Sequence, residues 1–278
     1  MNRIRSLLVH VDGAAGNIAR LTLACDLAER HGAALTVLFA ASPPLLDLPY
    51  AHVGGALALD GLQELFGQRV HGARRMLQRV LAQRALDCTW QELSGVTPGD
   101  GFARQALFAD LLVLGQHDHA DPSAQHVPSD FAYGVLLHSG KPALIVPSAG
   151  AHGGVGRKAV VAWKATRESA RALTAALPLL REAEKVHVFT WGGGSATRAG
   201  RTPDVERLLR LHGIDPVLHH ETRVPRELGE TLLSCAADLG ADLLVMGCYG
   251  HSRAREFVVG GVSRTVLASM TLPVLMCH

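Results

Sequence analysis

The sequence predicts an α/β protein built from two tandem, doubly wound, five-stranded parallel sheets with helices on both faces. Short apolar segments alternate with helical segments, the same segments recur in the second half of the chain, and a glycine-rich run separates the halves. Short strands without a polar face, alternating with helices, are typical of parallel sheets covered on both sides.

Three pairs of matching segments indicate an internal repeat. ADLLVLG at 109–115 recurs as ADLLVMG at 241–247, KPALIV at 141–146 aligns with LPVLMC at 272–277, and SLLVHV at 6–11 aligns with KAVVAW at 158–163. Matches in the same order indicate a tandem duplication. We therefore expect one domain over 1–150 and another over 151–278, joined within the flexible run SAGAHGGVG at 148–156.

The elements of the first copy follow from hydrophobic periodicity. The expected strands cover 7–11, 35–40, 87–93, 111–114 and 143–146, and the expected helices cover 17–30, 57–84, a short stretch after Gly101, and 130–138. Ser129 and Asp130 precede the last helix, so Asp130 is expected to be its N-cap.

The second copy repeats this alternation. Its expected strands cover 159–163, 185–190, 216–220, 243–246 and 274–277, and its third helix, at 203–212, is shorter than the counterpart at 57–84.

A glycine-spaced stretch, MGCYGHSRAREFVVGGVS at 246–263, links the fourth strand of this copy to its last helix. Its spacing, G-x2-G-x9-G, differs from both the dinucleotide-binding and the P-loop patterns. Glycine lets backbone N–H groups approach an anion, and a helix N-terminus favours negative charge. The alternative interpretation is that these glycines only turn the chain and let the helix pack closely.

This stretch resembles the motif of the universal stress proteins, in which G-x2-G-x9-G-[ST] follows the fourth strand and, in nucleotide-binding members, holds the phosphates and ribose of ATP. Gly261 replaces the hydroxyl residue, and Ser263 lies two positions further on. The resemblance extends over both copies. It implies the strand order 3-2-1-4-5 and a stress-response function as an ATP sensor or binding module.

In a doubly wound sheet, ligands bind at the carboxyl ends of the strands, where the strand order reverses. In the second copy, Thr190 and Trp191 follow the second strand. The residues expected to bind the nucleotide are Ala162, Trp163, Lys164, Thr190, Met246, Gly247, Tyr249, Gly250, Arg253, Gly260, Gly261, Val262 and Ser263.

Several of these residues have two interpretations. Lys164 stands where the family has an aspartate, so it either meets a phosphate or indicates that the ATP pose has been lost. Arg253 either clamps phosphate oxygens or is a solvated loop charge. Trp163 and Tyr249 either stack on a base or pack within the protein.

The first copy keeps the aspartate, as Asp12, but of the spaced glycines it retains only Gly115. Ser129 and Asp130 stand where Gly260 and Gly261 lie in the second copy. A carboxylate there would repel a phosphate, so we expect ATP in the C-terminal domain only.

No metal site and no catalytic site are expected. His117, Asp118, His119, Asp121 and His126 share one loop, and His219, His220 and Glu221 end a strand, but neither group has a zinc-type spacing. The chain has no nucleophile elbow and no evident triad. We therefore expect a binding protein and not an enzyme. The alternatives are a nucleotide-free scaffold acting through protein partners, and a weak ATP hydrolase.

Composition narrows the function classes. The formal net charge is +2 and the basic residues are dispersed, so neither nucleic acid nor a membrane surface is an expected partner. Five well-separated cysteines and the lack of a signal-like apolar segment after residue 5 favour the cytoplasm. The apolar strands at 143–146 and 274–277 are expected to pair antiparallel, making an intramolecular pseudo-dimer, and a homodimer is a further assembly the sequence allows.

Overall fold

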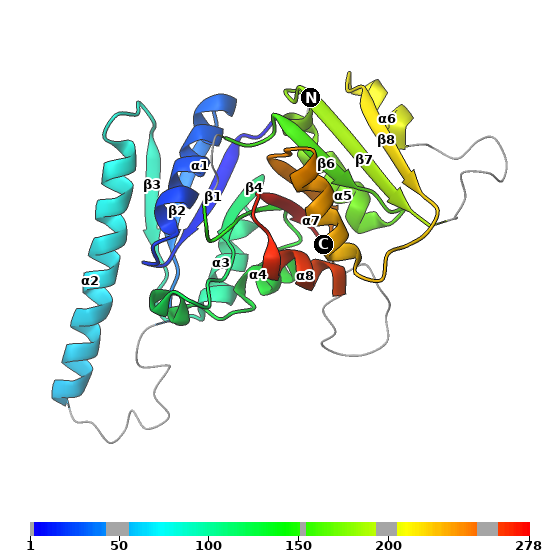
Figure 1. Cartoon of the computed structure of the whole chain (residues 1–278). Helices are drawn as coiled ribbons and strands as arrows, with labels where there is room; N and C mark the ends of the chain where they lie inside the picture. Colours follow the sequence, from blue (N-terminus) through cyan, green and yellow to red (C-terminus); the bar gives the residue numbers. More distant parts are fainter. Residues whose placement is uncertain (1–2, 43–55, 151–153, 193–204, 249–260) are drawn as a thin grey trace. The chain divides into compact units, whose positions relative to one another are not determined.

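The computed structural model describes residues 3–42, 56–150, 154–192, 205–248 and 261–278 (Figure 1). Contacts divide the chain into two compact units. The N-terminal unit comprises Ile4–Lys141 and Ser148–Gly150, and the C-terminal unit comprises Met1–Arg3, Pro142–Pro147 and Ala151–His278. The domain division at residue 150 drawn from the repeat stays a prediction.

The N-terminal unit alternates strands and helices along the chain. Its elements are β1 (Ser6–Val11), α1 (Asn17–His31), β2 (Ala34–Phe39), α2 (Ala56–Leu81), β3 (Cys88–Glu92), α3 (Pro98–Ala106), β4 (Leu111–Gly115), the 3-10 helix η2 (Pro122–His126) and α4 (Phe131–Ser139). The strands lie in the order β3-β2-β1-β4, and β1 pairs parallel with β2 and β4, as β2 does with β3. Helix α1 packs on α2, and α3 packs on α4.

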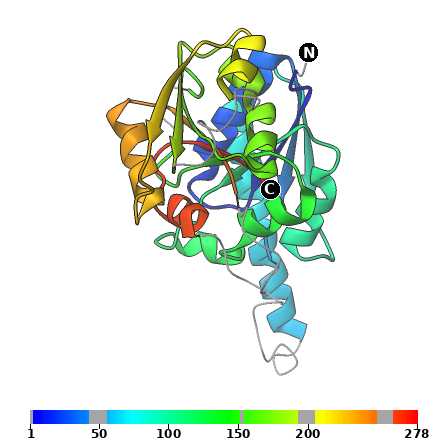
Figure 2. The same cartoon turned by 90° about the vertical axis from the view of Figure 1, so that its right-hand side faces the viewer.

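The C-terminal unit repeats the pattern and takes one strand from the first copy. Its elements are β5 (Ala143–Val146), β6 (Lys158–Ala162), α5 (Arg167–Leu180), β7 (Lys185–Trp191), α6 (Val205–Leu211), β8 (Pro216–Glu221), α7 (Leu228–Asp238), β9 (Leu243–Gly247), α8 (Gly261–Ser269) and β10 (Val274–Cys277). The strands lie in the order β5-β10-β9-β6-β7-β8, and α5 and α7 lie on opposite faces of the sheet (Figure 2). The second copy therefore has the predicted order 3-2-1-4-5, and the predicted fold class is confirmed.

Strand β5 explains why the contact-based boundary departs from the repeat. It pairs antiparallel with β10, with Leu144 opposite Leu275 and Ile145 opposite Val274. All four residues of each strand are buried. The fifth strand of the first copy thus belongs to the C-terminal unit by its contacts.

An aspartate of the repeat holds the first strand of each copy in place. Asp110 accepts hydrogen bonds from the backbone N–H groups of Arg5 (2.8 Å) and Ser6 (3.1 Å). Asp242 accepts them from Gly156, Arg157 and Lys158, each at 3.0 Å. A side chain that satisfies backbone donors at a strand end fixes where that strand begins. This gives the repeated Ala-Asp-Leu-Leu-Val segments a structural reason.

Helix starts depend on local capping. The Thr97 side chain accepts a hydrogen bond from the Asp100 N–H at 3.3 Å and begins α3. Asp130 occupies the N-cap position of α4, as predicted, although its side chain makes no capping hydrogen bond.

Candidate ligand site

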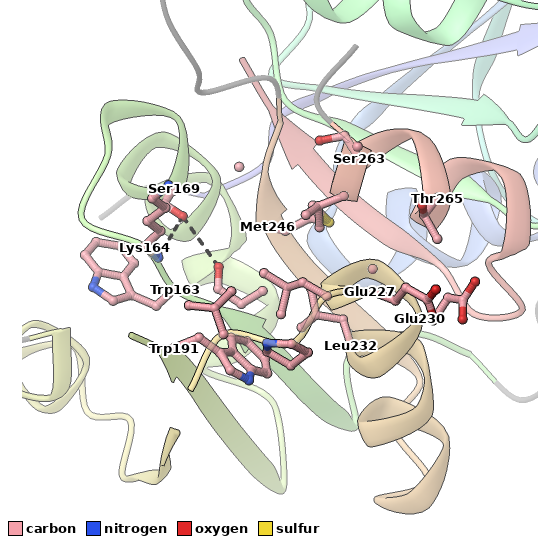
Figure 3. Close-up of a pocket in the computed structure, with 18 of the residues that line it drawn as sticks. Trp163, Lys164, Ser169, Trp191, Glu227, Glu230, Leu232, Met246, Ser263 and Thr265 are labelled. Carbon is pink, nitrogen blue, oxygen red and sulfur yellow. Dashed lines mark hydrogen bonds between the residues drawn. The ribbon is translucent and has the colours of Figure 1, made fainter. Parts of the chain in front are cut away.

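The C-terminal unit contains a cavity of about 550 Å³ at the carboxyl ends of β6 and β9 (Figure 3). Most of its wall is apolar, and ligand cavities in proteins typically measure roughly 300–1,000 Å³. Residues from six elements or their flanking loops line it: Ala162, Trp163, Lys164, Thr166, Glu168, Ser169, Trp191, Val224, Pro225, Arg226, Glu227, Leu228, Gly229, Glu230, Leu232, Met246, Gly247, Gly261, Val262, Ser263 and Thr265.

The first turn of α5 forms one side of the cavity. Thr166 caps this helix by accepting a hydrogen bond from the Ser169 N–H at 3.3 Å. The Ser169 hydroxyl accepts a hydrogen bond from the Lys164 N–H (3.3 Å) and donates one to the Ala162 carbonyl (3.5 Å; Figure 3). These bonds fix the loop between β6 and α5, so this wall is formed without a ligand.

Gly247 lets this turn approach the end of β9. A Cβ placed on Gly247 would lie 2.5 Å from the Ser169 backbone nitrogen. Since real Cβ atoms do not approach that closely, only glycine fits without a shift of α5. For the first motif glycine, the close-packing interpretation therefore has a direct structural basis.

Glu168 brings a buried carboxylate to the same wall. Only 5% of the residue is exposed. Burial raises the pKa of a carboxyl group, but hydrogen bonds, first among them the one from Arg167, outweigh it and hold the pKa of Glu168 below its usual value. Glu168 is therefore a negatively charged hydrogen-bond acceptor at neutral pH.

Helix α8 begins at the cavity with a glycine whose Cβ position is open among the described residues. A Cβ on Gly261 would meet no described atom within 4 Å. The first N–H groups of a helix have no partner within the helix and attract negative charge. Gly261 and Val262 therefore bring N–H groups of this first turn to the cavity, and Ser263 lines the same wall.

The wall at the start of α7 was not foreseen from the sequence. Val224–Leu228 and the first turn of α7 line the cavity, and Glu227 and Glu230 belong to this wall (Figure 3). Loop residues carry no periodic signal, so hydrophobic patterning could not select them. Their position after β8, at the same sheet edge as Trp191 at the end of β7, was the available signal.

The cavity brings together eight of the thirteen residues expected to bind a nucleotide. These are Ala162, Trp163, Lys164, Met246, Gly247, Gly261, Val262 and Ser263. Thr190 is not among the lining residues, and its hydroxyl lies 2.9 Å from the His220 Nδ1. Tyr249, Gly250, Arg253 and Gly260 lie outside the described residues.

Buried polar side chains pack against the corresponding strand end in the N-terminal unit. Arg20 of α1 is 5% exposed, and a Cβ on Gly115, at the end of β4, would overlap its guanidinium group. The Nη1 atom of Arg20 donates to the His10 carbonyl (2.9 Å) and also lies 2.9 Å from the His10 Nδ1. The end of β4 is thus in contact with a protein cation, whereas the end of β9 is in contact with the first turn of α5.

His10 is held as the neutral imidazole by its two partners. A guanidinium group cannot accept a hydrogen bond, so the His10 Nδ1 is the acceptor and its Nε2–H donates to the Ala40 carbonyl at 2.8 Å. Burial lowers the pKa of His10 to about 4, although the nearby Asp12 charge acts in the opposite direction. At Asp12, burial raises the pKa, but Arg20, His10 and other partners outweigh it and lower it overall.

The described residues show no metal site. Within these parts of the chain, no three His, Cys, Asp or Glu side chains form a group that could hold a metal ion. Asp118 and Asp121 instead accept backbone hydrogen bonds from Ala120 (2.9 Å) and Ser123 (2.8 Å).

The fold and the cavity define a doubly wound α/β protein with a ligand-sized space at the switch in strand order. Residues 156–278 match the model of the universal stress protein family, and this range contains every residue that lines the cavity. This range of the chain is therefore similar to the universal stress protein family, as its motif indicated.

Solved structures extend the fold to the whole chain. A universal stress protein from Archaeoglobus fulgidus matches with a TM-score of 0.69 and 15% identity, over 99% of this chain and 96% of its own. A functionally unknown protein from Pseudomonas aeruginosa matches with a TM-score of 0.53 and 15% identity, over 98% and 92%. At this identity the likeness shows the fold alone. A comparison with curated proteins gave no match. None of the helices in the described ranges is both long and apolar enough to cross a membrane.

Proposed function

We propose that this chain is a cytoplasmic stress-response protein that binds one ATP-class adenine nucleotide in the C-terminal cavity and acts as a sensor or binding module. The observation that carries the proposal is the cavity beside Gly261 at the start of α8 in the C-terminal unit. In the N-terminal unit, the buried Arg20 guanidinium packs against Gly115 at the end of β4.

The residues of the wall differ in their chemistry, so each part of the nucleotide is assigned to a different group of them. The phosphates are assigned to the N–H groups of Gly261, Val262 and Ser263, with Lys164 as a cation at the same cavity. Glu168 is assigned to the ribose hydroxyls, because a carboxylate accepts hydrogen bonds from hydroxyls and repels phosphate. Trp163, Trp191 and the apolar residues Val224, Leu228 and Leu232 are assigned to the base.

The remaining predicted residues complete this proposal. Tyr249, Gly250, Arg253 and Gly260 are assigned to the phosphate end of the ligand on the basis of the motif. Gly247 is assigned to the site as the residue that lets α5 approach, with no phosphate contact of its own.

A substitution at Gly261 tests the phosphate assignment. Because nothing described lies within 4 Å of its Cβ position, Gly261→Val should leave the fold intact and weaken ATP binding at least about tenfold by keeping the phosphate from the backbone. The matched control is Gly134→Val in α4, another helical glycine with open space around it. Isothermal calorimetry of both variants and the parent chain measures the effect. Equal ATP affinity in all three would refute the assignment.

A second function, that of a nucleotide-free scaffold, is favoured by one observation. The ionised Glu168 lines the cavity and would repel a phosphate placed near its carboxylate. In this case the same calorimetry would detect no ATP binding to the parent chain.

We also propose that the two domains form an intramolecular pseudo-dimer through their fifth strands. The antiparallel pairing of β5 with β10 supports this, because equivalent strands pair antiparallel across a two-fold axis.

A further inference from the structure

A stack of aromatic rings runs along one face of β7 and β8, away from the cavity wall. Trp191 lines the cavity and stacks on Phe189, with ring centroids 5.5 Å apart and planes inclined by 16°. Phe189 stacks in turn on His219, at 4.2 Å and 7°. In the β7–β8 register, Phe189 is the partner of His219 and Trp191 that of Glu221, so these side chains share a face.

A histidine pair ends this stack. The Nδ1 atom of His187 lies 2.9 Å from the Nε2 atom of His219. A hydrogen bond of this length needs one nitrogen with a proton and one without. The pair is therefore satisfied when both rings are neutral or when one proton is added, and it breaks when both rings are protonated.

The two rings have different surroundings. His219 lies flat over the face of the Phe189 ring. Burial lowers the pKa of His187, and His219, Lys185 and Lys158 lower it further. Protonation of both rings, which requires a charge on His187, is therefore unfavourable.

Other charged and titratable groups surround the pair. Lys158 on β6 and Lys185 on β7 lie near His187. Glu221 lies on the same face of β8 as His219, and Cys235 on α7 interacts with both Glu221 and Asp238. His220, the next residue, interacts with Thr190 and takes no part in the stack.

We propose that His187 and His219 are a proton-responsive support for the cavity wall, positioning Trp191 through Phe189 so that acidification weakens ligand binding. This inference rests on the proposed nucleotide site for its functional consequence. The support itself acts on Trp191 whether or not a ligand is bound.

Trp191 provides a direct readout without ligand. In the full chain with Trp90→Phe and Trp163→Phe, Trp191 is the one remaining tryptophan, and its emission is followed from pH 7.5 to 5. We expect a sigmoidal change with a midpoint below about 6.5, the ordinary pKa of histidine. His187→Gln, which keeps hydrogen-bonding groups but carries no charge, should abolish the change. The matched control His220→Gln should retain it.

The effect of pH on ligand affinity is measured with ATP by calorimetry. ATP should bind the parent chain at least about fivefold more weakly at pH 5.5 than at pH 7.5, and His187→Gln should reduce this difference. An emission change that persists in His187→Gln, disappears in His220→Gln or never occurs in the parent chain overturns the inference. If ATP binds at neither pH while the emission behaves as expected, the support stands and the proposed ligand fails.

Discussion

At the scale of single residues, the glycine that ends the fourth strand of each copy lets another part of the protein approach closely, and that part differs between the copies. Gly115 and Gly247 each end the fourth strand of a copy, and neither position has room for a Cβ. The space beside Gly115 holds the Arg20 guanidinium, and the space beside Gly247 holds the first turn of α5. The first glycine of the motif therefore serves protein packing, and the proposed phosphate contacts fall on the residues that follow.

The neutral His10 makes the stability of the chain depend on pH. Its pKa is lowered to about 4 in the folded state, so between about pH 6.5 and pH 4 the unfolded chain takes up a proton that the folded chain does not. Stability should therefore fall as the pH falls through this window, by at most about 3 kcal/mol from this group. Urea unfolding at pH 7, 5.5 and 4.5 measures it.

Other acidic and histidine groups also titrate in this range, so the test compares two chains. His10→Gln keeps a donor for Ala40 and an acceptor for Arg20 but cannot take up a proton. Its stability should fall less than that of the parent chain. Parallel loss in both chains would show that His10 does not contribute.

At the scale of elements, apolar strands were predictable and the groups that fill or line the sites were not. Hydrophobic runs located the described strands within one or two residues. Most of these strands are buried on both faces and read as continuous apolar segments, whereas β3 and β8 carry exposed residues. Arg20 was missed because an arginine on a helix is ordinarily solvated. Its spacing to Ala24 and Leu27, both fully buried, was the signal that it lies on the inner face of α1.

The cavity could be predicted in part. The rule that ligands bind at the carboxyl ends of strands led to Ala162–Lys164 and Met246–Gly247. It gave no means to recognise the α7 wall or the buried Glu168, because these depend on how loops and a neighbouring helix pack. The motif could not show that Gly247 packs against α5 while Gly261 has open space beside it, because this difference depends on the residues that surround each glycine.

The rate of hydrogen exchange in β5 should depend on the stability of the C-terminal unit. Gly247→Ala forces a Cβ against the Ser169 backbone and should destabilise that unit by about 1–3 kcal/mol. Hydrogen exchange should then accelerate in β5 as much as in β10, because the two strands are paired, and much less in β1 and β2. Mass spectrometry of exchanged peptides from the full chain measures this.

Gly261→Ala is the control, since its Cβ meets no described atom within 4 Å and exchange should stay as in the parent chain. Acceleration in β10 with β5 unchanged would contradict the assignment of β5 to the C-terminal unit.

At the scale of the whole molecule, the first four strands of the two copies lie in the same order, but different groups lie at the switch in strand order. The N-terminal unit places Arg20, His10 and Asp12 there, in a buried and mutually hydrogen-bonded or charge-coupled group. The C-terminal unit leaves about 550 Å³ of space. The consequence is a chain with one proposed ligand site, and the N-terminal copy contributes β5 to the unit that carries it.

The most direct test of this account is the number of nucleotides bound per chain. Native mass spectrometry of the full chain titrated with ATP should show a single added nucleotide at saturation, and Gly261→Val should show none at the same concentration. Two nucleotides per chain would mean that Arg20 does not close the N-terminal unit, and no bound nucleotide at any concentration would mean that the C-terminal cavity serves another ligand or none.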